Sequence, residues 1–189
     1  MAIWLVMRIP LLLTALVVVT TSLQAEESHP FQLSLTPEVA IHPKTAEIRG
    51  LSLNIWGENP QQGAAIGLVN GSSGESSGFS WGLVNYAESY KGVSWGLVNC
   101  SKTEFTGWQG GIFFFPCVVN VSRGRFTGFQ EAIVNYAEDF HGFQLGVVNY
   151  SENLHGLQIG LVNIAANNPW FKEFPDKLAT GFPIINWSF

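Results

Sequence analysis

Hydrophobic and polar positions alternate along most of the chain in a pattern that recurs about every 14 residues. Each copy ends in an apolar pair followed by Asn, and successive copies of this Asn are spaced by 15, 14, 21, 15, 14 and 14 residues. A period of this length, sustained over seven copies, is typical of repeat proteins in which each unit packs on its neighbours. The copies end at Asn70, Asn85, Asn99, Asn120, Asn135, Asn149 and Asn163.

The first half of each unit has the pattern of a strand. A representative copy is GFSWGLVN at 78–85, with apolar residues at the second, fourth and sixth positions and Ser or Gly between them. Alternation with a period of two predicts a strand with one buried face. We expect the apolar positions to face the interior, where Trp81 would stack on Trp95 and Phe129 on Phe143.

The second half of each unit varies more in sequence. Asn ends the strand, since this residue tolerates turn conformations and bonds its own backbone. An apolar residue then recurs two positions before the next Gly, and we expect it to point inward from a shorter return segment. These residues are Tyr90, Phe105, Phe126, Phe140 and Leu154.

The repeat predicts an all-β protein, a parallel β-solenoid with one unit per coil and capping ends. Equivalent residues would then lie about 4.8 Å apart, and the repeated Asn could bond along the stack as a ladder. The alternative is an antiparallel β-barrel or meander, since the ending FPIINWSF at 182–189 resembles the last strand of outer-membrane barrels. Strict alternation would place an Asn against lipid in every strand of such a barrel, which favours the solenoid.

Residues 1–25 have the layout of a secretory signal peptide. Arg8 precedes the apolar run at 11–19, and a short polar stretch ends at Ala25, the expected cleavage point. An uncleaved anchor is the alternative, but this run is shorter than the roughly 20 residues that span a membrane. The rest of the chain divides into an N-terminal cap with a first degenerate repeat (26–62), the tandem repeats (63–165, with an insertion near 111–117) and a C-terminal cap strand (166–189).

Charge excludes two classes of partner. The net charge is −5, only 12% of residues are charged, and no basic cluster is present. Nucleic acids and anionic lipid surfaces both require Lys and Arg, so neither is an expected partner. Membrane association is expected only for the barrel alternative.

Candidate chemistry is sparse. His141 and His155 occupy the same repeat position, as do Glu138 and Glu152, and Asp139 follows Glu138, so these five would gather on one edge of a solenoid. Two His with carboxylates could hold a divalent metal. Turn edges are polar in any case, and nothing in the sequence fixes these side chains, so we expect no metal and no cofactor.

No catalytic motif is present in the sequence. It has no Gly-x-Ser-x-Gly elbow, no phosphate-binding Gly-rich loop, and no His near either Cys, so we expect no enzyme activity. An exported chain with two Cys could form one disulfide, between Cys100 and Cys117. The equal alternative is two small buried thiols.

The repeat resembles that of bacterial exported surface-repeat proteins, which carry tandem Gly-Leu-Gln-x-Gly-Leu-Val-Asn units and have no established activity. The resemblance covers 31–189, including RGLSLNIWGEN at 49–59 and the Pro-x-x-Asn ending at 183–186. It implies export and residence in the periplasm or at the cell surface, and residence in the outer membrane is expected only for the barrel alternative. The chain differs from the lipoprotein members in having no Cys near Ala25, and the resemblance carries over no catalytic residues.

We therefore expect an exported, non-enzymatic repeat protein that acts as a structural or interaction surface at the bacterial cell envelope. The alternative function is that of a small outer-membrane β-barrel protein. The partner would be a protein or another envelope component, and the sequence indicates neither its identity nor the oligomeric state.

Overall fold

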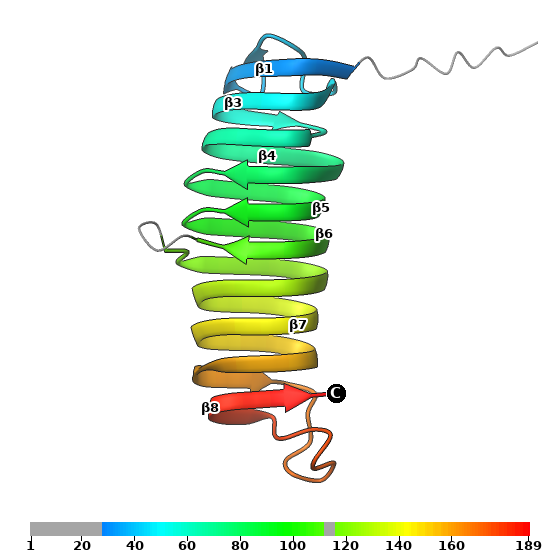
Figure 1. Cartoon of the computed structure of the whole chain (residues 1–189), viewed down its shortest axis with the longest axis vertical. Helices are drawn as coiled ribbons and strands as arrows, with labels where there is room; N and C mark the ends of the chain where they lie inside the picture. The colour runs from blue at the N-terminus through cyan, green and yellow to red at the C-terminus, as the bar shows by residue number, and fades with distance from the viewer. Residues whose placement is uncertain (1–27, 112–115) are drawn as a thin grey trace, which may run out of the picture.

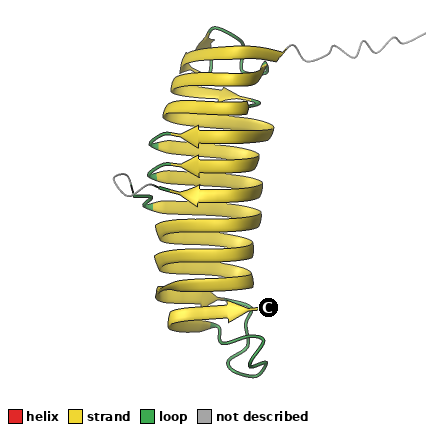
Figure 2. Ribbon diagram, in the orientation of Figure 1, coloured by secondary structure: helices red, strands yellow, loops and turns green. Residues whose placement is uncertain are grey.

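The computed structural model describes residues 28–111 and 116–189. The predicted signal peptide (1–25) and most of the insertion near 111–117 lie outside the described residues. Within them the regular elements are all strands (Figure 2), and they form one open sheet in the order β2-β1-β3-β4-β5-β6-β7-β8. The strands are β1 (Ser28–Thr36), β2 (Val39–Ala40), β3 (Glu47–Asn59), β4 (Gln62–Trp81), β5 (Val84–Trp95), β6 (Val98–Gly110), β7 (Val119–Ala165) and β8 (Gly181–Ser188).

The ribbon winds in successive circuits, here called coils, that are stacked along one axis (Figure 1). Neighbouring coils pair in parallel with a register of one repeat, so that Asn85 lies between Asn70 and Asn99. β7 is 47 residues long and passes through several coils without a break. The all-β class and the parallel pairing of the repeats are confirmed, and the antiparallel alternatives are wrong for the described repeats.

The side of the strand that faces the interior differs from the prediction. The buried positions hold the repeated Asn, the Gln or Ser of each unit, small Ala or Ser residues, and the apolar residue of the variable half. Phe105, Phe126 and Phe140 are at most 1% exposed, as expected for that position. The second and fourth positions point outward instead, so Trp81, which is 42% exposed, lies outside the coil.

The Leu-Val pair before each Asn is the reason for this reversal. In the unit that ends at Asn85, both Leu83 and Val84 point away from the interior, because the chain bends there. Two consecutive outward residues shift the alternation by one position. A one-residue shift moves every side chain of a strand to its other face. The apolar residues before the Leu-Val pair can therefore point outward while the Asn after the pair points inward.

The Gly that precedes the Leu-Val pair makes room for the ladder of Asn side chains. A Cβ atom added at Gly82 would lie 2.7 Å from Nδ2 of Asn70, and one added at Gly96 would lie 2.7 Å from Nδ2 of Asn85. Both distances are shorter than real Cβ contacts. The Gly and the Asn of the repeated phrase are therefore two parts of one packing arrangement between successive coils.

Both ends of the stack are covered by short strands. At the N-terminal end, β1 pairs in parallel with β3, and β2 adds an antiparallel pair. At the C-terminal end, β8 pairs antiparallel with the last coil of β7, with Ile185 opposite Ile159. Exposed sheet edges attract other strands, so β8 protects the last coil from further pairing.

Candidate functional site

The interior is organised by a ladder of Asn side chains that runs through the stack. Asn70 donates to the side-chain oxygen of Asn85 at 2.9 Å, and each later Asn up to Asn149 donates in the same way to the next Asn at 2.8–3.0 Å. The second hydrogen of the amide is also used: Asn85 donates to the carbonyl of Trp95, and Asn149 to that of Ile159. Buried amides are tolerated because they are bonded in this way.

A Gln ladder in the later repeats and a column of aromatic rings also lie in the interior. Gln158, Gln144 and Gln130 each donate to the Gln of the preceding coil, at 2.8–3.0 Å. Phe126 lies between Phe105 and Phe140 with ring centroids 5.3 and 5.2 Å away and nearly parallel planes. The inner surface is therefore engaged in contacts between coils.

The outer surface consists largely of apolar columns. Members of a column occupy the same repeat position and lie in register on neighbouring coils. In the column formed by the Leu of the Leu-Val pair, Ile133 is 47% exposed and Leu161 is 69% exposed. This corner column consists of Leu68, Leu83, Leu97, Val118, Ile133, Val147 and Leu161. Monomeric soluble proteins rarely expose large contiguous apolar patches, so this surface is unusual.

Aromatic rings stack along the outside of the coils. Phe129 and Phe143 lie parallel with centroids 5.5 Å apart, and Trp95 packs edge-on against Trp108 at 5.0 Å. The predicted stack of Phe129 on Phe143 therefore exists, but it lies on the outer surface rather than in the interior. Trp81 and Trp95 are in register, also on the outer surface.

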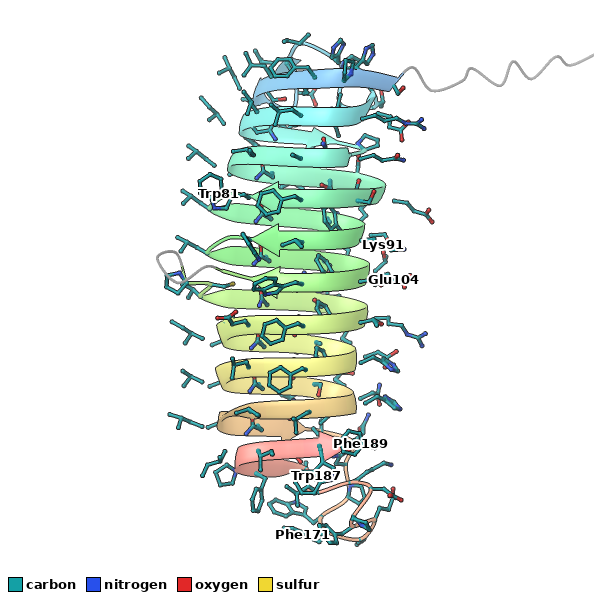
Figure 3. All side chains as sticks on the ribbon, viewed as in Figure 1. Trp81, Lys91, Glu104, Phe171, Trp187 and Phe189 are labelled. Carbon is teal, nitrogen blue, oxygen red and sulfur yellow. The ribbon has the colours of Figure 1, made fainter. Side chains whose placement is uncertain are left out.

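Charged side chains gather along the opposite edge of the stack. Lys91 and Glu104 project from this edge, away from Trp81 (Figure 3). The open groove along it has mixed charge, and one of its backbone amides, that of Gly74, donates to the Glu88 carboxylate at 2.8 Å. The outside of the molecule is therefore amphipathic, with apolar columns on one side and a polar edge on the other.

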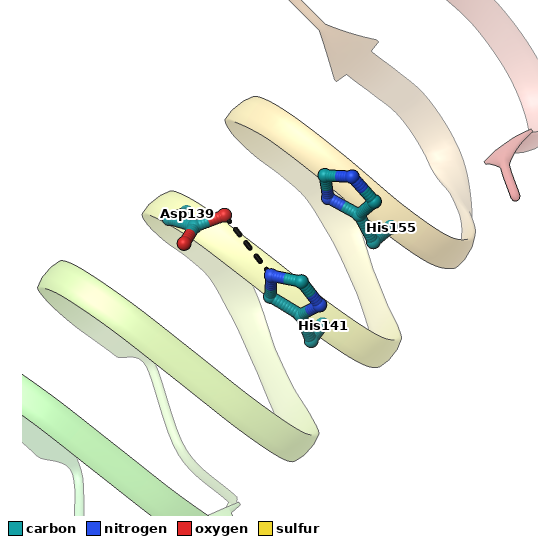
Figure 4. A group of neighbouring side chains, drawn as sticks. All are labelled: Asp139, His141 and His155. Carbon is teal, nitrogen blue, oxygen red and sulfur yellow. Dashed lines mark hydrogen bonds and ion pairs between the residues drawn. The ribbon is translucent and has the colours of Figure 1, made fainter.

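Two His and one Asp lie together on the polar edge (Figure 4). The rings of His141 and His155 are stacked with centroids 4.5 Å apart, and Nε2 of His141 lies 3.2 Å from the Asp139 carboxylate. Arg125 donates to the other oxygen of that carboxylate at 2.9 Å. Partial burial acts to raise the pKa of Asp139, but the hydrogen bonds and charges of Arg125 and His141 outweigh it and hold this pKa below its usual value.

The predicted metal candidates are brought together only in part. His141 and His155 are neighbours, as their equal repeat positions indicate, and Asp139 lies beside them as expected, but Glu138 and Glu152 are not part of the group. Glu138 accepts a hydrogen bond from the amide of Gly124 at 2.8 Å, and the carboxylate of Glu152 accepts one from the hydroxyl of Tyr136 at 3.4 Å.

The geometry of the His pair is that of a stack. A zinc ion binds imidazole nitrogens at about 2.0–2.1 Å and along the ring plane. The two ring planes differ by 2° and lie one above the other, so their lone pairs do not converge on one point. His29 and His42 stack in the same way at 3.6 Å.

We expect the purified protein to contain much less than one metal ion per chain by elemental analysis, because parallel rings and an Asp139 engaged by Arg125 leave no converging ligand set. The expected content is the same for His141→Ala and for the control His29→Ala. One zinc ion per chain that is lost in His141→Ala but retained in His29→Ala would contradict this prediction.

The two Cys are free and do not form a disulfide. Cys100 lies in an outer column, in register with Tyr86 and Val121, whereas Cys117 is buried and contacts the Asn ladder at Asn99. Burial raises the pKa of the Cys117 thiol to about 11, which keeps it protonated. Of the two alternatives left open by the sequence, the structure has the unpaired thiols, of which only Cys117 is buried.

The sequence analysis missed the apolar outer columns. A signal for them was present, since 47% of the residues are hydrophobic and a coil of about 14 residues can enclose only a few large side chains. We did not predict these columns from that signal, because we expected the apolar residues to face the interior.

Searches of protein family models, curated proteins and solved structures found no match to this chain. None of the described residues belongs to a helix of the length and apolar character needed to cross a lipid bilayer.

Proposed function

We propose that this chain is an exported, non-enzymatic β-solenoid whose apolar outer columns form an interaction surface at the bacterial cell envelope. The observation that carries the proposal is the reversal of polarity across the strands: the amides are buried in ladders and the large apolar side chains lie outside. Exposed apolar surface is costly in water, so a surface that repeats it along the whole stack is best explained by a partner that covers it.

The repeat register supports the solenoid. Equivalent residues of successive units pair in parallel from β4 through β6 and into β7, as one unit per coil requires. Each strand contacts mainly the strands before and after it in the chain, which is typical of repeat proteins.

Export and envelope residence rest on the sequence. Residues 1–25 have the layout of a signal peptide, and the repeat resembles that of exported surface-repeat proteins. The lack of enzyme activity is proposed because the sequence has no catalytic motif, and because the one His-Asp group described above is a stacked pair with an Arg-bound carboxylate.

Fractionation of a bacterial host that expresses the full chain tests this proposal. We expect a processed protein that begins at Glu26 and is recovered with the envelope. The double variant Leu83→Lys with Ile133→Lys places two charges on the corner column, and we expect it to move to the soluble exported fraction by about tenfold or more, because burying an unpaired charge opposes association.

A matched control carries the same added charges on exposed polar positions, as Thr127→Lys with Asn153→Lys. We expect this control to fractionate like the unmodified chain. An unprocessed protein that stays in the cytoplasm would refute export. Equal envelope recovery of both double variants would refute a role for the apolar columns.

A further inference from the structure

One part of the apolar exterior is a continuous face, here called the aromatic face. It consists of the outward residues at the second and fourth positions of each unit together with the corner column. Its second-position column is Phe79, Val93, Trp108, Phe129, Phe143 and Leu157. The pairing of β1, β3 and β4 extends this column toward the N-terminus through Ala64 and Leu51 to Phe31.

We infer that the aromatic face is the contact surface between two copies of this chain. The inference rests on the proposed function, because it names the occupant of the apolar surface proposed there. Four features favour a second copy: the area of the face, its charge, its regular spacing and the saturation of its backbone.

The area of the face is sufficient for a stable dimer. From Phe31 to Leu157 the column crosses eight steps between coils, or about 40 Å at 4.8 Å per step. The face is about five residues wide, or about 16 Å, so each copy would bury about 600 Å². The total of about 1,200 Å² reaches the lower limit of stable protein–protein interfaces, and the roughly 600 Å² of each copy lies at the upper end of the apolar patches found on monomers.

The charge of the face is unlike that of a lipid-binding surface. Segments that lie on membranes flank their apolar side with Lys and Arg. Among the described residues, the aromatic face contains neither, and the only charged side chain in its columns is Glu131. Lys91 lies on the far edge of the stack (Figure 3), and Lys102 and Arg125 line the groove along that edge. With a net charge of −5, the chain has no electrostatic attraction to anionic lipid.

The regular spacing of the face makes it complementary to itself. Its side chains form straight columns with one residue per coil, so the columns of one copy can lie in the grooves between those of another. A two-fold axis would bring the same columns together from both copies, as in most homodimers.

Backbone groups at the edge of the face are already paired, which lowers the cost of excluding water. The amide of Leu83 donates to the carbonyl of Leu68 at 2.9 Å, and that of Val98 donates to the carbonyl of Leu83 at 3.0 Å. A partner that covers this corner therefore leaves these groups bonded.

Glu131 provides a specific test of the interface. It lies at the fourth position of its unit, beside a hollow of about 280 Å³ that is also lined by Cys117, Ile133 and Leu145. A second copy would dehydrate this carboxylate, and a dehydrated charge without a partner opposes association. Glu131→Gln keeps the shape of the side chain and should therefore tighten the dimer.

Sedimentation equilibrium of the purified, processed protein tests the inference. We expect a dimer with a Kd at or below about 10 µM, near the weak end of the micromolar-to-picomolar range of protein–protein interfaces. Leu145→Lys should weaken the dimer by about a hundredfold, and Glu131→Gln should tighten it by about tenfold. The control Tyr150→Lys adds the same charge to an outer column beyond the Leu-Val corner, and it should leave the Kd unchanged.

A monomer at 100 µM would overturn the inference, and so would association that Leu145→Lys and Tyr150→Lys weaken equally. Flotation with neutral phosphatidylcholine vesicles tests the other possible occupant of the face, a lipid surface. Binding of monomers to these vesicles, lost in Leu145→Lys, would assign the face to lipid and refute the dimer while leaving the proposed interaction surface intact. The proposed function itself fails only if the envelope recovery described above does not depend on the apolar columns.

Discussion

Gly128→Ala is expected to destabilise the protein by more than about 3 kcal/mol, or to prevent the repeats on either side of it from pairing. Gly128 has φ = +135°, a conformation that side chains disfavour, and an added Cβ would overlap the carbonyl oxygen of Gly107 in the preceding coil. The added Cβ is fixed to the backbone of one coil and would overlap the backbone of the preceding coil, so no side-chain rotation relieves the clash. Urea unfolding followed by far-ultraviolet circular dichroism measures the loss.

Gly74→Ala is the matched control. Gly74 also has a positive φ, of 58°, but an added Cβ would have no heavy atom within 4 Å. We expect a loss of only about 1–2 kcal/mol, the cost of the left-handed conformation alone. Equal losses for the two variants would show that conformation, and not the close approach of the coils, explains the Gly at the start of each unit.

Asn135→Asp is expected to cost about 3–5 kcal/mol at neutral pH, although it changes one atom and leaves no cavity. The Asn135 amide donates to the carbonyl of Leu145 and to Asn149, both at 2.9 Å, and it accepts from Asn120 at 2.9 Å. A carboxylate would place an oxygen against two acceptors. Asn153→Asp is the control, because Asn153 is exposed. Its side-chain oxygen accepts a hydrogen bond from Asn167 at 2.7 Å, and a carboxylate oxygen can accept the same bond.

The loss in Asn135→Asp should depend on pH. Burial among acceptors raises the pKa of the introduced carboxyl above the value of about 3.9 that it has in the unfolded chain. The unfolded state then binds fewer protons than the folded state, so stability rises as pH falls through the raised pKa. Unfolding at pH 7 and pH 5 should show part of the loss recovered at pH 5 relative to Asn153→Asp. An equal loss at both values would contradict a buried charge.

The sequence was sufficient to predict the pairing of the repeats. Spacings of 14 or 15 residues correspond to the observed register, in which Asn85 pairs with Asn99. The inward position of Phe126 and its equivalents is also confirmed, since Tyr90, Phe105, Phe126, Phe140 and Leu154 are all buried. In physical terms, periodicity specifies which residues lie in register, and this information is present in any long repeat.

The orientation of the strands could not be obtained from alternation alone. Two residues at the Leu-Val corner both point outward, and the period of two does not reveal such a corner. The same limit applies to the candidate site, where spacing placed His141 beside His155 but could not show that Glu138 bonds to the amide of Gly124. Side-chain partners depend on local backbone direction, which a repeat position does not specify.

The two amide ladders differ in direction, and this has an electrostatic consequence along the axis of the stack. Each Asn donates toward the C-terminal end, as Asn120 does to Asn135, whereas each Gln donates toward the N-terminal end, as Gln144 does to Gln130. Chains of hydrogen bonds polarise one another, so a single ladder would build a dipole that grows with every coil. Where both ladders are present, the two dipoles oppose each other. Units of this type can therefore be added without accumulating charge separation between the ends of the molecule.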